Sequence, residues 1–105
     1  MVYYIYVIRL DTAVLESFKF RRHNPNLNPK LPCYYIGQSA HPPETRFWQH
    51  KKGYKSNYYA KEFGLGLCPQ YYDDINPIKS RKDAEMIESK LTEYFRSHGY
   101  GVWSN

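Results

Sequence analysis

Two stretches of the chain consist almost entirely of β-branched and aromatic residues, a pattern that predicts strands. Residues 2–9 read VYYIYVIR and have no charged position before Arg9, which indicates a strand buried on both faces. Residues 33–38 read CYYIGQ and predict a second strand that ends near Gly37. A less regular apolar pattern in residues 65–75 indicates a third strand within that segment.

Two helices are predicted between the second and third strands. Residues 43–52 follow a pair of prolines, which suit a first helical turn, and the segment stops at Gly53. The second helix is predicted to run to about Phe63, with Ser56 as its N-cap and Gly64 as its stop.

The strongest helix signal begins after Ser80, which forms a capping-box pattern with Asp83. Apolar residues then recur at helical spacing, at Ala84, Ile87, Leu91 and Phe95. Strands and helices in this order predict an α+β chain, and 105 residues suit a single domain.

The pattern breaks over residues 10–32, between the first two strands. Asparagines alternate with prolines there, which predicts turns and extended chain without a helix. The charged residues of the segment are Asp11, Glu16, Lys19, Arg21, Arg22 and Lys30. Two interpretations stay open: a solvated surface loop, or a basic arm in which Arg21 and Arg22 contact phosphates.

Composition indicates that the protein has an anionic partner. The formal net charge is +5, and tyrosine alone supplies 12 residues that can stack or hydrogen-bond. No apolar run approaches the roughly 18 residues of a membrane span, and the first residues lack the pattern of a secretory leader. We therefore expect a cytoplasmic protein with no membrane partner.

Cysteine and histidine spacing gives no sign of a disulfide framework or of a zinc site. Cys33 and Cys68 lie far apart, so we expect reduced, buried thiols and no disulfide framework. The four histidines have no spacing that matches a zinc site.

One acidic residue stands out in the last predicted helix. Glu88 projects from the edge of the apolar stripe, whereas Glu85 and Glu93 point away from it. A carboxylate near a packed face is unfavourable unless it is paired or binds a cation. Glu88 either reaches solvent or a basic neighbour, or it binds a hard cation such as Mg²⁺. Periodicity leaves both open.

The first predicted helix carries a second candidate cluster. Arg46 and His50 are four residues apart and share a face, while Phe47 and Trp48 are expected to provide the packing side. This face is either solvated, or it places a guanidinium and an imidazole beside a phosphate.

The two strands together carry the most specific motif. Tyr4-Ile5-Tyr6 and Tyr35-Ile36-Gly37 resemble the two halves of the signature of the GIY-YIG nuclease family. Further along the chain, the family's remaining positions are matched by Arg46, His50, Glu88 and Asn105. The resemblance covers nearly the whole chain.

Three departures from the family pattern are visible. Tyr4 stands where the family usually has glycine, residues 10–32 lengthen a link that is usually short, and the proline pair adds a residue before Arg46. None of them removes a catalytic side chain. The long link leaves open whether the site has the usual entrance.

The resemblance implies a three-stranded antiparallel sheet flanked by helices, in one domain over residues 1–105 with residues 10–32 as an insertion. It implies a metal-dependent endonuclease that hydrolyses phosphodiester bonds of DNA with Mg²⁺ or Mn²⁺ as cofactor. Glu88 would be the only protein ligand of the metal, which suffices because Mg²⁺ keeps several waters and takes phosphate oxygens.

The resemblance also implies that Tyr6 is the general base. A tyrosine pKa near 10 means that this role needs help from a cation. Tyr4 and Tyr6 share one face of the strand, so either of them can face the site.

The other implied roles belong to Tyr35, Arg46 and His50. Tyr35 would orient the water or the phosphate, and Arg46 would neutralise charge on the phosphate in the transition state. His50 would bind phosphate or relay a proton. Structural positions at the site are Gly37 and Asn105.

A phosphate track is a further candidate along the first two helices. It would be lined by Lys51, Lys52 and Lys55, together with Lys61. Solvated lysines explain the same pattern. Tyr58 and Tyr59 either stack on bases or pack, and we expect at least one of the two to pack.

Two other functions stay open. One is a non-catalytic nucleic-acid-binding module on the same fold, and the other is a structural or protein-interaction domain whose tyrosines form an interface. The sequence contains no helix-turn-helix or zinc finger. A DNA target would therefore be selected by a protein partner, by a homodimer, by the basic arm or by DNA shape.

Overall fold

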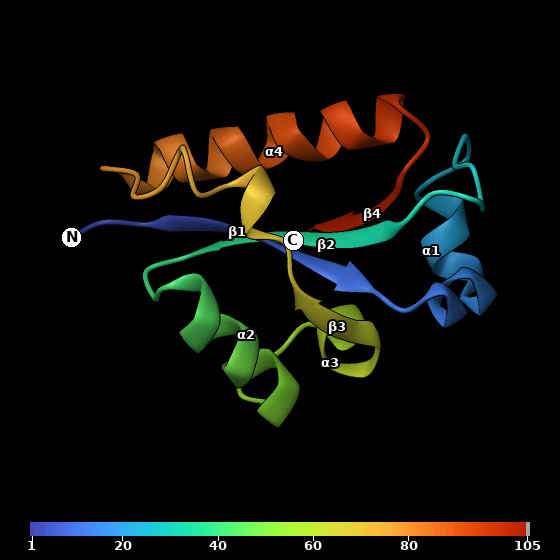
Figure 1. Cartoon of the computed structure of the whole chain (residues 1–105), viewed down its shortest axis with the longest axis horizontal. Coiled ribbons are helices and arrows are strands. Elements are labelled where there is room, and N and C mark those ends of the chain that lie inside the picture. The colour runs from blue at the N-terminus through green and yellow to red at the C-terminus, as the bar shows by residue number, and fades with distance from the viewer. Residues whose placement is uncertain (105) are drawn as a thin grey trace.

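The computed structural model describes residues 1–104 of the chain (Figure 1). The elements in chain order are β1 (Tyr4–Leu10), η1 (Thr12–Glu16), α1 (Phe18–Arg22), β2 (Cys33–Ser39), α2 (Pro43–Lys52), α3 (Tyr58–Phe63), β3 (Gly64–Leu67), η2 (Pro69–Tyr71), α4 (Arg81–Ser97) and β4 (Gly101–Ser104). Over residues 1–104, no helix has the length and apolar character needed to cross a membrane.

Four strands form one mixed sheet in the order β3-β1-β2-β4. β1 pairs antiparallel with β2 and with β3, whereas β4 pairs parallel with β2. The α+β class is therefore confirmed, but the prediction of a three-stranded antiparallel sheet is wrong by one strand. The added strand has only four residues and begins with Gly101, too short a segment to show a strand period.

Helices cover both faces of the sheet, with α4 on one face and α2 and α3 on the other (Figure 1). The centre of β1 is buried without a break, which confirms the prediction of a strand covered on both sides. Tyr6 contacts His50 of α2, whereas Tyr34 contacts Phe95 of α4. Because side chains alternate along strands, Tyr35 lies on the α2 side together with Tyr6.

The helix α2 has the predicted bounds and ends at Gly53, whose φ of 84° lies in the left-handed region. Its packing side differs from the expectation. Trp48 is 60% exposed, and the helix buries Pro43 and His50 with Phe47 half-buried between them. The predicted packing role of Trp48 is wrong, because positions 43, 47 and 50 share the face that meets the sheet.

The helix α3 begins one residue later than predicted. Its N-cap is Asn57, whose side chain accepts hydrogen bonds from the N–H groups of Tyr59 and Ala60, so the capping role assigned to Ser56 is wrong. Tyr59 is buried and Tyr58 is exposed, which confirms that at least one of the two tyrosines packs.

The helix α4 starts as predicted, because Ser80 accepts a hydrogen bond from the N–H of Asp83 at 3.1 Å. Its buried face consists of Ala84, Glu88, Thr92 and Phe95, with Ile87 and Leu91 half-buried beside it. Glu88 therefore lies in the middle of the face that meets the sheet, and the prediction that it stands at the edge is wrong.

Residues 10–32 contain two short helices, η1 and α1, so the prediction of a helix-free segment is wrong. Asp11 accepts from the N–H of Ala13 and Ser17 from that of Phe20, which caps the two elements. Each element has five residues, too few to show a helical period. Phe20 is fully buried and ties α1 to the core.

Asn24 joins this segment to the opposite end of the chain. Its side-chain amide donates to the carbonyls of Phe20 and Val102 at 2.8 and 3.0 Å. Its side-chain oxygen accepts from the N–H of Val102 at 2.9 Å and from Nε of Arg96 at 3.0 Å. One buried amide thus holds α1, α4 and β4 together, since each of its polar atoms has two partners.

We expect Asn24→Ala to lower the free energy of unfolding by about 2–4 kcal/mol, because it leaves several buried polar groups without partners. Denaturant unfolding monitored by circular dichroism measures this change. The matched control is Asn26→Ala at an exposed position of the same segment, with an expected change within about 0.5 kcal/mol. Equal effects of the two substitutions would contradict the structural role of Asn24.

Candidate active site

The candidate site lies at the edge of β2, beyond the end of β4. The pairing of β4 with β2 ends at Ile36 and Ser104, so within residues 1–104 the last three residues of β2 have no partner on that side. Gly37 lies opposite Tyr6 in the sheet. A Cβ at Gly37 would meet the Tyr6 hydroxyl and lie 2.5 Å from its Cζ, so glycine makes room for the phenol.

The hydroxyl of Tyr6 is held by His50. Nε2 of His50 lies 2.8 Å from the Tyr6 oxygen, and both residues are buried. Nδ1 of His50 accepts a hydrogen bond from the backbone N–H of Asn57 at 3.1 Å. A neutral imidazole that accepts at Nδ1 carries its proton on Nε2, so His50 donates to the Tyr6 oxygen.

Burial controls the charge states of this pair. Burial, aided by the charge of Arg46, lowers the pKa of His50 to about 4, so the imidazole is neutral at neutral pH. Burial raises the pKa of Tyr6 to about 12, although the charge of Arg46 and a hydrogen bond from Tyr35 act in the opposite direction. Arg46 and Tyr35 therefore favour the Tyr6 phenolate, whereas the loss of solvent and the charge of Glu88 disfavour it.

Tyr35 stands next to this pair on the same face of the sheet. Its ring centroid lies 6.1 Å from that of Tyr6 and 5.3 Å from that of His50. Burial, the neighbouring Tyr6 and the charge of Glu88 raise the pKa of Tyr35 above its usual range, so its hydroxyl stays protonated.

Arg46 is half-buried on α2, and its guanidinium is held by the turn that follows the helix. It donates to the side-chain oxygen of Gln49 at 3.2 Å and to the carbonyls of Tyr54 and Lys55 at 3.2 and 2.7 Å. The charge of Arg46 acts on the pKa values of Tyr6 and His50, which places the guanidinium beside both.

Glu88 approaches this cluster from α4, the helix on the other side of the sheet. It is only 7% exposed, and its charge raises the pKa values of Tyr6 and Tyr35. It lines an open cavity of about 640 Å³ together with Gln38 and Ser104, at the end of β4. Glu88 is the one member of the candidate site that lines this cavity, since Tyr6, Tyr35, Arg46 and His50 are not among its lining residues.

The donors around Glu88 suit a hard cation. In the same cavity, amide and hydroxyl oxygens come from Gln38, Ser89, Thr92 and Ser104, and the lining also includes Arg81 and Arg96. Within residues 1–104, no group of three or more His, Cys, Asp or Glu side chains is placed to hold a metal ion. A site built on one carboxylate fits Mg²⁺ or Mn²⁺, which retain waters, better than it fits zinc.

Five of the sequence-predicted residues are thus brought together: Tyr6, Tyr35, Arg46, His50 and Glu88. Between the two candidate tyrosines of β1, Tyr6 is the one that contacts His50, whereas Tyr4 lies opposite Ser39. Both ring nitrogens of His50 already have hydrogen-bond partners, one of which is the Tyr6 hydroxyl. His50 is therefore better placed to hold the Tyr6 phenol than to bind a phosphate. Asn105 lies outside the described residues.

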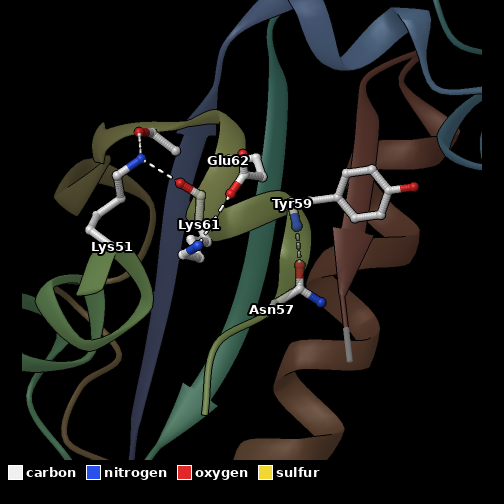
Figure 2. A network of polar contacts seen from close by, with 6 residues as sticks. Lys51, Asn57, Tyr59, Lys61 and Glu62 are labelled. Carbon is white, nitrogen blue, oxygen red and sulfur yellow. Dashed lines mark hydrogen bonds and ion pairs between the residues drawn. The ribbon is translucent and has the colours of Figure 1, made fainter. Parts of the chain in front are cut away.

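The predicted phosphate-binding lysines lie on the α2 side, and each has a local partner. Lys51 donates to the carbonyls of Lys61 and Gly64 at 2.7 and 2.9 Å, as Figure 2 shows, and so ties α2 to the end of α3. The ammonium of Lys52 lies over the ring of Trp48, and that of Lys55 over the ring of Tyr54.

The predicted arginines 21 and 22 lie away from these lysines, on α1 at one end of the sheet (Figure 1). Their guanidinium groups lie near the ring of Phe18. They form a separate surface that is not part of the cluster around Tyr6.

Sequence reasoning missed Asn57, which caps α3 with its side chain and fixes the His50 tautomer with its backbone N–H. An asparagine just before a helical pattern signals an N-cap, and that signal was available here. No sequence signal pointed to Gln38 or Ser104 as neighbours of Glu88. These residues belong to different elements, and the pairing of β2 with β4 is what brings them to the same cavity.

Comparisons with models of known protein families, with curated proteins and with solved structures found no match to this chain. The likeness to GIY-YIG nucleases therefore depends on the residues described above.

We expect a specific loss of stability on acidification. Between pH 6.5 and 4 the unfolded chain protonates His50 and the folded chain does not, so stability falls as the pH falls through this window. The loss should be roughly 3 kcal/mol in the wild type, and it should be absent from His50→Gln, which cannot titrate.

Denaturant unfolding of both proteins at several pH values tests this, because their difference isolates His50 from the carboxylates they share. If the two stability curves run parallel from pH 7 to pH 4, His50 is not buried as a neutral imidazole.

Proposed function

We propose that this protein is a metal-dependent endonuclease that hydrolyses phosphodiester bonds of DNA. The observation that carries the proposal is the convergence of a buried tyrosine–histidine pair, an arginine and a carboxylate at one sheet edge. Glu88 and Tyr6 are both buried, and the charge of Glu88 raises the pKa of the Tyr6 phenol. Burying the two groups together is unfavourable, so structural packing alone gives no reason for it.

In this proposal the Tyr6 phenol first gives its proton to bulk solvent, and the resulting phenolate then takes a proton from the attacking water. As the phenolate forms, it is stabilised by Nε2–H of His50, by the Tyr35 hydroxyl and by the positive charge of Arg46. Bound at Glu88, a divalent cation would offset the carboxylate charge that opposes this ionisation and would bind phosphate oxygens.

Arg46 would stabilise the charge that develops on the phosphate in the transition state. Its guanidinium is held by two backbone carbonyls and one side chain, so it is oriented before a substrate arrives. His50 acts as a positioning residue, because it contacts Tyr6 and is fully buried.

We propose DNA as the partner and leave its sequence and structure undetermined. A protein partner or a homodimer would supply target selection in addition to the basic surfaces of the chain. The competing function, a non-catalytic nucleic-acid-binding module on the same fold, differs in one observable: it binds DNA without metal-dependent turnover.

We expect the purified protein to nick or cleave plasmid DNA in the presence of Mg²⁺ or Mn²⁺. Glu88→Gln, Tyr6→Phe and Arg46→Ala should each lower the cleavage rate by about 10²–10³-fold, because each removes one group that acts in the transition state. Gel-resolved single-turnover cleavage with and without EDTA measures the effect.

The matched controls are Tyr4→Phe, on the same strand face, and Glu62→Gln, an exposed glutamate paired with Lys61. Both should cleave at the wild-type rate. DNA that stays intact with Mn²⁺ while the folded protein binds it would favour the non-catalytic module. Cleavage that survives Glu88→Gln would contradict the assigned role of Glu88.

A further inference from the structure

Positive charge gathers in two segments of the chain. Residues 17–43 contain no Asp or Glu, and they hold four basic residues: Lys19, Arg21, Arg22 and Lys30. Residues 45–61 also contain no Asp or Glu, and they hold five basic residues: Arg46, Lys51, Lys52, Lys55 and Lys61. The net charge therefore attracts an anionic ligand to both segments, of which the first is the one in the insertion.

The helix α1 presents three of these cations beside an exposed and a half-buried aromatic ring. Phe18 is 65% exposed, and the guanidinium carbons of Arg21 and Arg22 each lie 5.9 Å from its ring centroid. On the adjoining strand β4, the half-buried Trp103 ring lies 4.4 Å from that of His23 at a tilt of 52°, and Nζ of Lys19 lies 5.5 Å from its centroid. We call this surface the α1 patch; its members are Phe18, Lys19, Arg21, Arg22, His23 and Trp103.

The α1 patch is hollowed, and its cations have no acidic partner among residues 1–104. A depression of about 510 Å³ is lined by Phe18, Lys19, Arg22 and His23. The ion pairs among residues 1–104 are Lys61 with Glu62 and Arg81 with Glu85, so no acidic partner engages the cations of the patch. An exposed ring flanked by unneutralised cations suits a ligand that is both flat and anionic.

Unpaired nucleic acid has these two properties. Its phosphates bind guanidinium and ammonium groups, and its bases expose flat faces that stack on aromatic side chains. Duplex DNA offers the same phosphates but hides its base faces within the stack. Phe18 has no polar atom with which to bind a phosphate or a base edge, so its exposure discriminates in favour of the unpaired strand.

We propose that the α1 patch binds an unpaired segment of DNA, with bases stacked on Phe18 and at the His23–Trp103 pair and with phosphates on the neighbouring cations. This inference deepens the proposed nuclease function and depends on it for its meaning, since it assigns the enzyme a substrate with a single-stranded part. Binding itself can be measured without cleavage.

The strand β4 connects the α1 patch to the candidate active site. Trp103 belongs to the patch and pairs with Tyr35 across the sheet, whereas the next residue, Ser104, lines the cavity at Glu88. The backbones of Trp103 and Tyr35 are therefore one strand spacing apart, about 5 Å across the sheet. The insertion of residues 10–32 thus provides a substrate surface that a short link would lack.

The test measures fluorescence anisotropy of labelled DNA with the full chain in EDTA, which prevents cleavage. The probes are oligothymidine of about 16 nucleotides, a blunt duplex, and the same duplex with an unpaired tail. The variant is Phe18→Ala/Arg21→Ala/Arg22→Ala, whose three positions are exposed. The control, Tyr94→Ala/Lys82→Ala/Lys90→Ala, also removes one exposed aromatic ring and two charges, from α4.

We expect the α1 variant to bind oligothymidine and the tailed duplex at least about tenfold more weakly, and the blunt duplex less than about threefold more weakly. Its log–log salt slope for oligothymidine should flatten by about 1.4, since two phosphate contacts are lost. The control should match the wild type on all three probes. Unchanged circular dichroism and melting would show that the variant is folded.

Equal losses on blunt and tailed duplexes, or no loss on any probe, would overturn the proposal. Failure of the nuclease function is a separate result: an intact α1 preference with no Mn²⁺-dependent cleavage by the wild type removes the activity and supports the patch. If the wild type cleaves plasmid DNA but the variant at Phe18, Arg21 and Arg22 binds every probe as the wild type does, only the proposal about the α1 patch fails.

Discussion

The hydrogen bond between His50 and Tyr6 is the interaction on which the candidate chemistry depends. Its direction is set by the backbone of Asn57, whose N–H occupies Nδ1 and leaves the proton of His50 on Nε2. The Tyr6 oxygen is therefore an acceptor, and a donor already in place stabilises a phenolate more than a phenol. Gly37 supplies the space that this arrangement needs.

The short strand β4 explains where the candidate site is. Within residues 1–104 its pairing stops at Ile36, so the last residues of β2 have no partner on that side, near Tyr6 and the charge of Glu88. Asn24 fixes the position of β4 through Val102. The insertion that carries Asn24 is thus part of the framework around the site, and its helix α1 supplies a basic surface.

Local patterns predicted much of the fold, because strand composition, the Ser80 cap and the glycine at position 53 act within a few residues. The parts that failed depend on distant contacts. Trp48 faces solvent and His50 faces the sheet because of how α2 is rotated against β1, which spacing alone does not specify. The five residues at the site were found through a family motif, while Asn57, Gln38 and Ser104 join the site only through three-dimensional pairing.

The most direct test of this account is the tautomer of His50, measured by long-range ¹⁵N–¹H NMR correlation of the histidine rings at neutral pH, with His50→Gln to assign the signal. The account predicts a neutral ring with its proton on Nε2, unchanged down to about pH 5. A ring protonated on Nδ1, or an imidazolium at neutral pH, would contradict it, because neither can both accept from Asn57 and donate to Tyr6.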